Sequence, residues 1–188
     1  MKIPKLLDRS KTCYVFLWAT QKKIPVARGV LTKWGATQTH DICWVKLNQL
    51  NRLVSAGRTG YYFNHAKETC IVGIFKAHGN NNSDYERFAG AGGGASVFNQ
   101  QVVKDSDVIC SKVREVSRKP DEVYGIINRL VGQESKKIEL FARNWNVVAA
   151  SKYKNWVAVG NQIRKTEIDK DDLELKRRFQ QTYPEFAN

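Results

Sequence analysis

The sequence predicts an α/β layer structure, in which short apolar strands alternate with amphipathic helices. Apolar runs of strand length, such as residues 15–18 and 156–159, recur between polar or glycine residues. Elsewhere the apolar residues follow the helical period, as they do at Val123, Ile126, Ile127 and Leu130. A chain of 188 residues is long enough to bury a substantial core, and we expect a single domain spanning residues 1–188.

The first half of the chain supplies three strands and one helix. Residues 15–18 predict a buried strand, and residues 26–34 predict a short helix that Gly35 ends. Further strands are expected at residues 42–45 and 71–75.

The second half begins with a short strand around residues 108–109. Pro120 then opens a helix that runs through Leu130, with Asp121 and Glu122 in its first turn, where carboxylates meet the positive end of the helix dipole. Two more strands are expected, at residues 138–141 and 156–159. A charged helix at residues 169–181 follows them and is expected to dock lightly on the domain.

Residues 77–97 interrupt this pattern with little apolar surface, and we expect a flexible insertion. Residues 90–95 formally satisfy a dinucleotide-binding fingerprint, but the residues before them are not a strand and no clear helix follows. The insertion is either a disordered linker or a flap that contacts nucleic acid.

The net charge of the chain is +13, from 31 basic and 18 acidic residues. This balance favours polyanionic partners, although a generally solvated basic surface explains it as well. The four cysteines lie singly in or beside apolar runs, as reduced core thiols do, and their spacing does not indicate a zinc site. The sequence contains neither a membrane-spanning run nor a signal peptide, so we expect an intracellular, soluble protein.

Polar side chains gather after two of the predicted strands. Arg143, Asn144 and Asn146 follow the strand at 138–141, and Asn161 and Gln162 follow the strand at 156–159. In open α/β sheets ligands bind beyond the carboxyl ends of the strands, so these side chains are predicted to face one crevice. Amides both donate and accept, which suits an adenine edge or a ribose. The alternative is that they only make turns.

Eight short segments carry a resemblance to a known family. They are residues 41–50 (DICWVKLNQL), 57–60 (GRTG), 64–68 (NHAKE), 98–100 (FNQ), 107–109 (DVI), 118–125 (RKPDEVYG), 137–143 (KIELFAR) and 160–162 (GNQ). In this order they resemble the MT-A family of adenine-N6 methyltransferases, which act on mRNA or DNA. The resemblance implies a Rossmann-like class I methyltransferase fold with a mostly parallel sheet flanked by helices. It also implies S-adenosylmethionine as the cofactor, no metal, and residence in the nucleus.

The resemblance assigns roles to individual residues. Lys76 matches a lysine that reaches the methionine end of the cofactor. Arg143 and Asn146 match ribose contacts, with Asn144 between them, while Asn161 and Gln162 match contacts around the ribose and adenine. Trp145 stands where catalytic relatives carry histidine.

The catalytic motif of the family, Asp-Pro-Pro-Trp, has no match in this chain, which contains no Pro-Pro pair. No catalytic residue is therefore assigned, and catalysis by this chain alone is not expected. Our main hypothesis is a non-catalytic scaffold, a pseudo-methyltransferase that pairs with a catalytic subunit and helps bind DNA or RNA. The alternative is a fragment of the catalytic subunit, whose motif lies outside this sequence. Met1 and Trp145 favour the scaffold, and the retained residues 160–162 favour the fragment.

Residues 47–64 form a long, polar and basic connection. In the family this segment pairs two related subunits, so we expect a heterodimer with a second family member. The aromatic residues at 61–63 are large for a bare loop, and either a partner or the core of this chain covers them. The predicted interface residues are Asn48, Gln49, Arg52, Arg58, Tyr61 and Tyr62.

Overall fold

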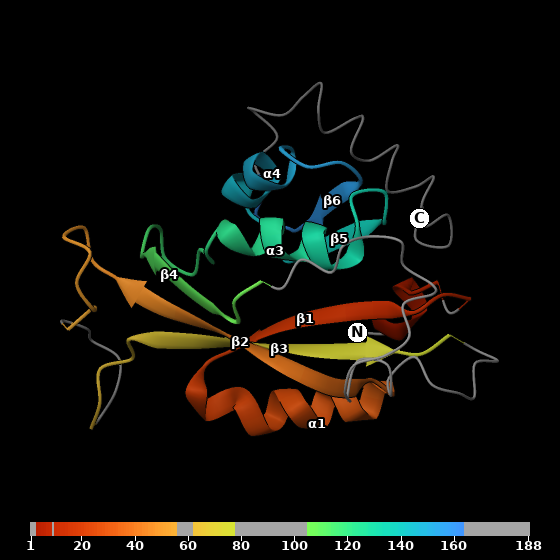
Figure 1. Ribbon diagram of the computed structural model, residues 1–188, viewed down its shortest axis with the longest axis horizontal. Coiled ribbons are helices and arrows are strands. Elements are labelled where there is room, and N and C mark those ends of the chain that lie inside the picture. Colours follow the sequence, from red (N-terminus) through yellow and green to blue (C-terminus); the bar gives the residue numbers. More distant parts are fainter. Residues whose placement is uncertain (1–2, 9, 56–61, 78–104, 164–188) are drawn as a thin grey trace. The chain divides into compact units, whose positions relative to one another are not determined.

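The computed structural model describes residues 3–8, 10–55, 62–77 and 105–163 (Figure 1). The chain divides into two compact units, residues 1–111 and 112–188, and each is described by itself below. The predicted insertion, apart from Ala77, and the predicted helix at 169–181 lie outside the described residues. The expectation of a single domain therefore stays a prediction.

The first unit is built on a four-stranded sheet. Its strands lie in the order β1-β3-β2-β4, and both β1 and β2 pair antiparallel with β3. β4 continues the sheet beyond β2, where the Cys43 N–H donates to the Asp107 carbonyl at 2.7 Å. The bounds are β1 Cys13–Ala19, β2 Thr37–Leu47, β3 Lys67–Phe75 and β4 Val108–Lys112.

The prediction of a mostly parallel sheet is wrong for this unit. Since β1 and β2 both run opposite to β3, they run in the same direction as each other, and α1 (Ile24–Trp34) connects them in the way that a β-α-β crossover requires. β3 then returns between them in the opposite direction. The periodicity of a single strand does not indicate the direction of its neighbours, which explains the error.

α1 covers one face of this sheet (Figure 1). Its buried residues Ala27 and Leu31 pack on Ile71 and Phe75 of β3. The helix ends as predicted at Gly35, whose φ of 84° lies in the left-handed region that glycine adopts without strain. Two short 3₁₀ turns, η1 (Ile3–Leu6) and η2 (Gln21–Lys23), were not predicted.

The second unit contains a second, smaller sheet, and its strands are parallel. β5 (Lys137–Leu140) pairs with β6 (Trp156–Val159), and α4 (Asn144–Ala150) crosses over between them. α3 (Glu122–Val131) precedes this β-α-β motif in the chain. The strands and α3 lie close to their predicted positions, whereas α4 was not predicted. The structure is thus a mixed α/β fold, as expected at that level.

Buried polar groups hold the second unit together. The Lys137 ammonium is buried and donates to the carbonyls of Gln133 and Ser135 at 3.0 and 2.7 Å, which fixes the turn before β5. The Trp156 indole donates to the Asn128 side chain at 3.2 Å. Phe141 departs from the prediction, because it leaves β5 with a φ of 62° and is 78% exposed. In neither unit is any described helix both long and apolar enough to cross a membrane.

Candidate functional site

The parallel pairing of β5 with β6 brings the carboxyl ends of both strands to one edge. The pairing ends with Leu140 opposite Val159, and the Ala142 N–H then donates to the Val159 carbonyl at 2.9 Å. A further parallel bridge joins Arg143 to Gln162. The two polar segments after the strands therefore continue side by side, as the strand-end argument predicted.

Gly160 makes this close approach possible. A Cβ atom at this position would lie 1.9 Å from the Ala142 carbonyl oxygen and 2.7 Å from its nitrogen, which is too close for any side chain. The glycine of the Gly160-Asn161-Gln162 segment thus has a packing role. It lets the backbone that carries Asn161 and Gln162 run against the backbone that carries Arg143.

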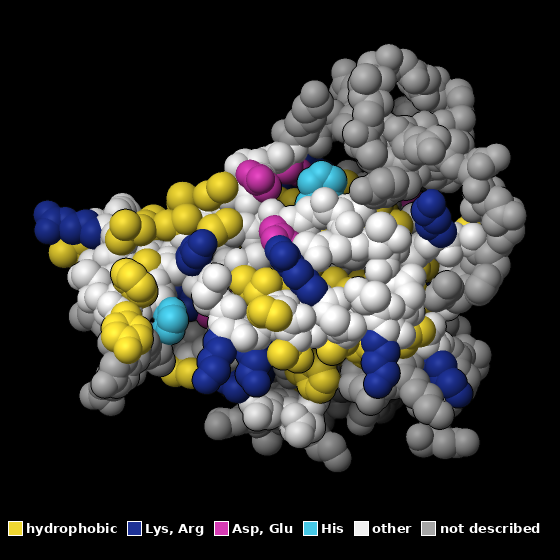
Figure 2. Space-filling view, turned by 90° about the horizontal axis from the view of Figure 1, so that it is seen from below, with side chains coloured by type: hydrophobic (Ala, Val, Ile, Leu, Met, Phe, Trp, Pro, Cys, Tyr) yellow, Lys and Arg dark blue, Asp and Glu magenta, His cyan; other side chains and the backbone are white. Residues whose placement is uncertain are grey.

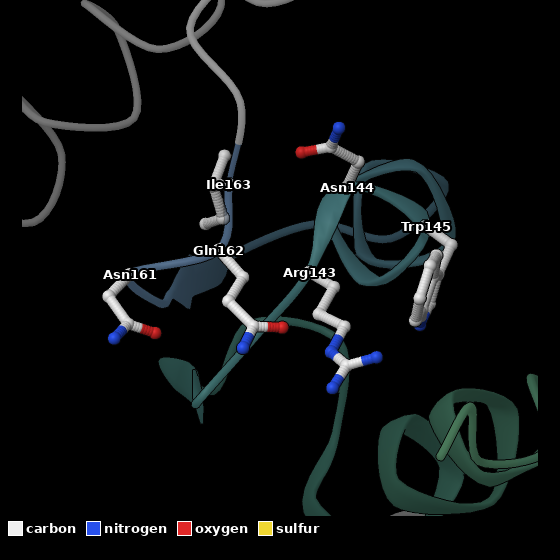
Figure 3. Close-up of a pocket in the computed structure, with 6 residues that line it drawn as sticks. All are labelled: Arg143, Asn144, Trp145, Asn161, Gln162 and Ile163. Carbon is white, nitrogen blue, oxygen red and sulfur yellow. The ribbon is translucent and has the colours of Figure 1, made fainter. Parts of the chain in front are cut away.

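A pocket of about 640 Å³ lies where these segments meet. Figure 3 shows the side chains of Arg143, Asn161 and Gln162 pointing to the same side, whereas Asn144 points the other way. The structure therefore brings together four of the six residues predicted to bind the cofactor, and their role as contacts stays a prediction. The lining residues are Arg143, Asn144, Trp145, Asn161, Gln162 and Ile163.

The Arg143 guanidinium is held in place on two sides. It lies 5.3 Å from the centre of the Trp145 ring, within cation–π distance, and one of its Nη atoms donates to the Val116 carbonyl at 3.2 Å. The pocket thus carries a planar cation, an indole face and two exposed amides. This donor and acceptor set suits a nucleoside, whose base offers an aromatic face and a hydrogen-bonding edge.

Asn146, predicted as a ribose contact, does not line the pocket. Its Oδ1 accepts from the Arg143 N–H at 2.9 Å. Its Nδ2 donates to Glu139 Oε1 at 2.9 Å and to Tyr124 Oη at 3.1 Å. Both the oxygen and the nitrogen of the amide make hydrogen bonds within the second unit. Asn146 therefore fixes the start of α4 and with it the positions of Arg143 and Trp145.

Glu139 and Tyr124 complete this network, and neither was predicted from the sequence as a site residue. The Tyr124 hydroxyl donates to Glu139 Oε2 at 2.6 Å. Burial raises the pKa of the Glu139 carboxyl, and the Tyr124 hydrogen bond only partly opposes that shift. Burial and the Glu139 charge likewise raise the pKa of Tyr124, so its hydroxyl remains a donor. The signal for this network in the sequence was a glutamate inside the apolar run at 138–141.

Lys76 belongs to the first unit, where it follows β3, and it is not among the residues that line the pocket. Among the described residues there is also no group of three or more His, Cys, Asp or Glu side chains that could hold a metal ion.

Part of the predicted partner surface is described in the first unit. Asn48 Oδ1 accepts from the N–H groups of Leu50 and Arg52 at 2.9 and 3.0 Å, which shapes the turn after β2. Tyr62 and Phe63 are 84% and 82% exposed, so neither packs into the core of this unit. Gln49 also lies in this connection, whereas Arg58 and Tyr61 lie outside the described residues.

Comparisons with known proteins extend over nearly the whole chain. The sequence profile of the MT-A70 family matches residues 1–162. The chain is 38% identical over 185 residues to the N(6)-adenosine-methyltransferase catalytic subunit METTL3 of Homo sapiens, covering 98% of this chain and 27% of that protein.

Two further relatives show how the similarity is distributed. The identity is 37% over 183 residues to the N(6)-adenosine-methyltransferase MT-A70-like protein of Drosophila melanogaster, covering 97% of this chain and 25% of that protein. The identity is 26% over 168 residues to the N(6)-adenosine-methyltransferase non-catalytic subunit METTL14 of Xenopus tropicalis, covering 84% of this chain and 31% of that protein. The chain thus spans about a quarter of the length of the METTL3-type relatives.

Proposed function

The chain belongs to the MT-A70 family, and from that premise we propose that it forms the cofactor-binding part of a subunit that methylates adenosine N6 in RNA. The observation that carries this proposal is the pocket at the carboxyl ends of β5 and β6. Ligands of α/β folds bind at such edges, and this edge carries side chains suited to a nucleoside.

The chemistry of the pocket fits the adenosine half of S-adenosylmethionine. The exposed amides of Asn161 and Gln162 can both donate and accept, as an adenine edge and a ribose diol require. Trp145 offers an aromatic face beside the Arg143 guanidinium. When bound, S-adenosylmethionine supplies a methyl group activated by its sulfonium.

The residues of this chain contribute binding and orientation. Asn161 and Gln162 hold the nucleoside, and Arg143 lines the same pocket in an orientation that Trp145 and Val116 maintain. Methyl transfer to an exocyclic amine depends mainly on such positioning and on removing water from the amine. The target adenine has to be unstacked to reach the cofactor, so a single-stranded substrate is expected.

Similarity favours the catalytic type of subunit over the scaffold. The identity is 38% to a subunit named catalytic and 26% to one named non-catalytic. The scaffold remains a second candidate because of one residue, Trp145, which replaces the histidine expected from the family with a bulkier side chain inside the pocket.

Isothermal titration calorimetry with S-adenosylmethionine tests the proposal. We expect saturable binding by the wild-type chain, and binding about tenfold weaker in Asn161→Ala, because roughly 1.4 kcal/mol of hydrogen bonding is lost. Gln133→Ala is the matched control, since it removes an exposed amide of the same unit outside the pocket. A folded wild-type chain that does not bind would reject the proposal and favour the scaffold.

We also propose that the connection after β2 pairs with a second MT-A70 subunit. Large side chains are exposed there, with Leu50 at 73%, Tyr62 at 84% and Phe63 at 82%. Such apolar exposure is typical of an interface core.

Sedimentation velocity of a mixture with a METTL14-type subunit tests this pairing. The double variant Tyr62→Ser/Phe63→Ser is expected to lose the heterodimer, whereas Val26→Ser, which alters another exposed apolar residue, keeps it. Retention of the heterodimer by the double variant would contradict this assignment.

A further inference from the structure

The segment around α1 contains basic residues and no acidic ones. No Asp or Glu occurs between Asp8 and Asp41. In this interval Lys22, Lys23 and Lys33 are exposed, and none of them makes an ion pair in the part of the chain that the structure describes. Arg28 differs, because it pairs with Asp41 at 2.9 Å. We call Lys22, Lys23 and Lys33 the α1 basic face.

The lysines of this face lie on the exposed surface of η2, which contains Lys22 and Lys23, and of α1, which contains Lys33. Ala27 and Leu31 are the buried residues of α1, so the helix packs through them, while Lys33 and Val26 remain exposed. With a rise of about 1.5 Å per residue, Lys23 and Lys33 lie roughly 15 Å apart along the axis. A segment of this length can contact more than one phosphate of the same strand.

The surroundings of the face are consistent with a polyanion partner. Figure 2, seen from the side of α1, shows Lys and Arg side chains at several places and a few Asp and Glu side chains among them. α1 itself has no acidic residue in its sequence. Exposed lysines that make no ion pair within the described residues are complementary to phosphate.

We propose that the α1 basic face binds the phosphate backbone of a single-stranded RNA. The choice of RNA rests on the function proposed above, but the face itself consists of residues that do not line the pocket. It would hold the strand by charge alone, without reading its sequence. The face is therefore a separate binding surface that raises affinity for any RNA strand.

Fluorescence anisotropy with a labelled polyuridine strand tests this assignment at several salt concentrations. The test variant reverses three charges (Lys22→Glu, Lys23→Glu and Lys33→Glu). The matched control reverses three exposed lysines of the second unit and changes the net charge equally (Lys136→Glu, Lys152→Glu and Lys154→Glu).

The two variants are expected to behave differently. The α1 variant should bind at least tenfold more weakly, and the slope of log affinity against log salt should fall by about 2, at roughly 0.7 per lost contact with a single strand. The control should keep the wild-type slope. Equal losses in both variants would show an effect of net charge only and would overturn the proposal, as would a wild-type chain that does not bind RNA.

Three further measurements separate this inference from its alternatives. Binding of S-adenosylmethionine should be the same in the α1 variant as in the wild type, so a loss of RNA binding with an intact pocket is distinguishable from a failed cofactor site. The far-UV circular dichroism of the variant should show that it folds. Binding to phosphatidylserine vesicles that depends on the α1 face, without RNA binding, would assign the face to membranes and reject the proposal.

Discussion

Gly160 is the residue whose identity the backbone restricts most clearly. Any Cβ at this position would overlap the Ala142 carbonyl, so Gly160→Ala must push β6 away from the segment after β5. We expect the variant to lose about 1–3 kcal/mol in the free energy of unfolding. Gly29→Ala is the control, because a Cβ there meets nothing within 4 Å and α1 should gain roughly 0.5–1 kcal/mol.

Urea denaturation of both glycine variants provides the measurement. Because the mechanism is a steric clash at the edge that forms the pocket, Gly160→Ala should also lose affinity for S-adenosylmethionine. Equal stability of the wild type and Gly160→Ala would mean that the close approach to Ala142 does not exist in solution.

Glu139 and Asp121 should make the free energy of unfolding depend on pH in opposite directions. Burial raises the pKa of Glu139 above its ordinary value of 4.5, so the folded state binds its proton more tightly than the unfolded state. The stability that this group contributes is then complete below about pH 4.5 and is lost as the pH rises through the raised pKa. Burial would also raise the pKa of Asp121, but hydrogen bonds from Arg114 and Arg118 lower it, and its contribution is lost as the pH falls.

Denaturation at a series of pH values checks these signs against Glu139→Gln and Asp121→Asn. The wild type minus Glu139→Gln difference in the free energy of unfolding should decrease from acidic to neutral pH, whereas the wild type minus Asp121→Asn difference should increase. Parallel pH profiles for the wild type and Glu139→Gln would contradict a raised pKa for Glu139.

Part of the site could be predicted because apolar runs in the sequence indicate where the strands end. Arg143, Asn161 and Gln162 follow apolar runs, and parallel pairing brings such positions together. Asn146 could not be assigned in the same way, because only the folded helix shows that its amide turns toward Glu139 and Tyr124. Hydrogen bonds among three separate elements leave no spacing in the sequence that would reveal them.

At the scale of elements, α4 depends on its first turn. The Asn146 side chain accepts from the Arg143 N–H, one of the donors that a helix start leaves without a partner. Asn146→Ala should therefore lower the free energy of unfolding by about 0.5–2 kcal/mol and loosen Arg143 and Trp145. Val148→Ala in the same helix is the control, since Val148 is 62% exposed and its loss should cost less than about 0.5 kcal/mol.

Thermal unfolding and cofactor titration together check the role of α4. If Asn146 positions the pocket, Asn146→Ala should weaken S-adenosylmethionine binding, and Asn146→Asp should not restore the stability, because its carboxyl group would face that of Glu139. A stable Asn146→Ala variant with wild-type affinity would contradict this role.

The elements themselves were predictable to different degrees. Short apolar runs and glycine stops located β1, α1 and β6 from the sequence. α4 escaped prediction because it is short and contains asparagines and two valines, which favour helices weakly. Its crossover between parallel strands stabilises it instead. The antiparallel direction of β3 also depends on pairing, which no local pattern encodes.

At the scale of the whole molecule, the proposed function combines two binding surfaces with different chemistry. The pocket of the second unit carries amides, an indole and one guanidinium, whereas the α1 basic face of the first unit carries lysines only. Charge composition alone suggested a polyanion partner without locating its surface. The sequence motifs identified the family, but they did not settle whether this chain binds the cofactor.

The most direct test of the central claim is NMR titration of the ¹⁵N-labelled chain with S-adenosylmethionine. The side-chain amide signals of Asn161 and Gln162 and the indole signal of Trp145 should shift with one saturation curve. Those of Asn128 and Asn155, whose amides have partners inside the unit, should not move. Saturable shifts that leave Asn161, Gln162 and Trp145 unchanged, or no shifts at all, would contradict the assignment of this pocket to the cofactor.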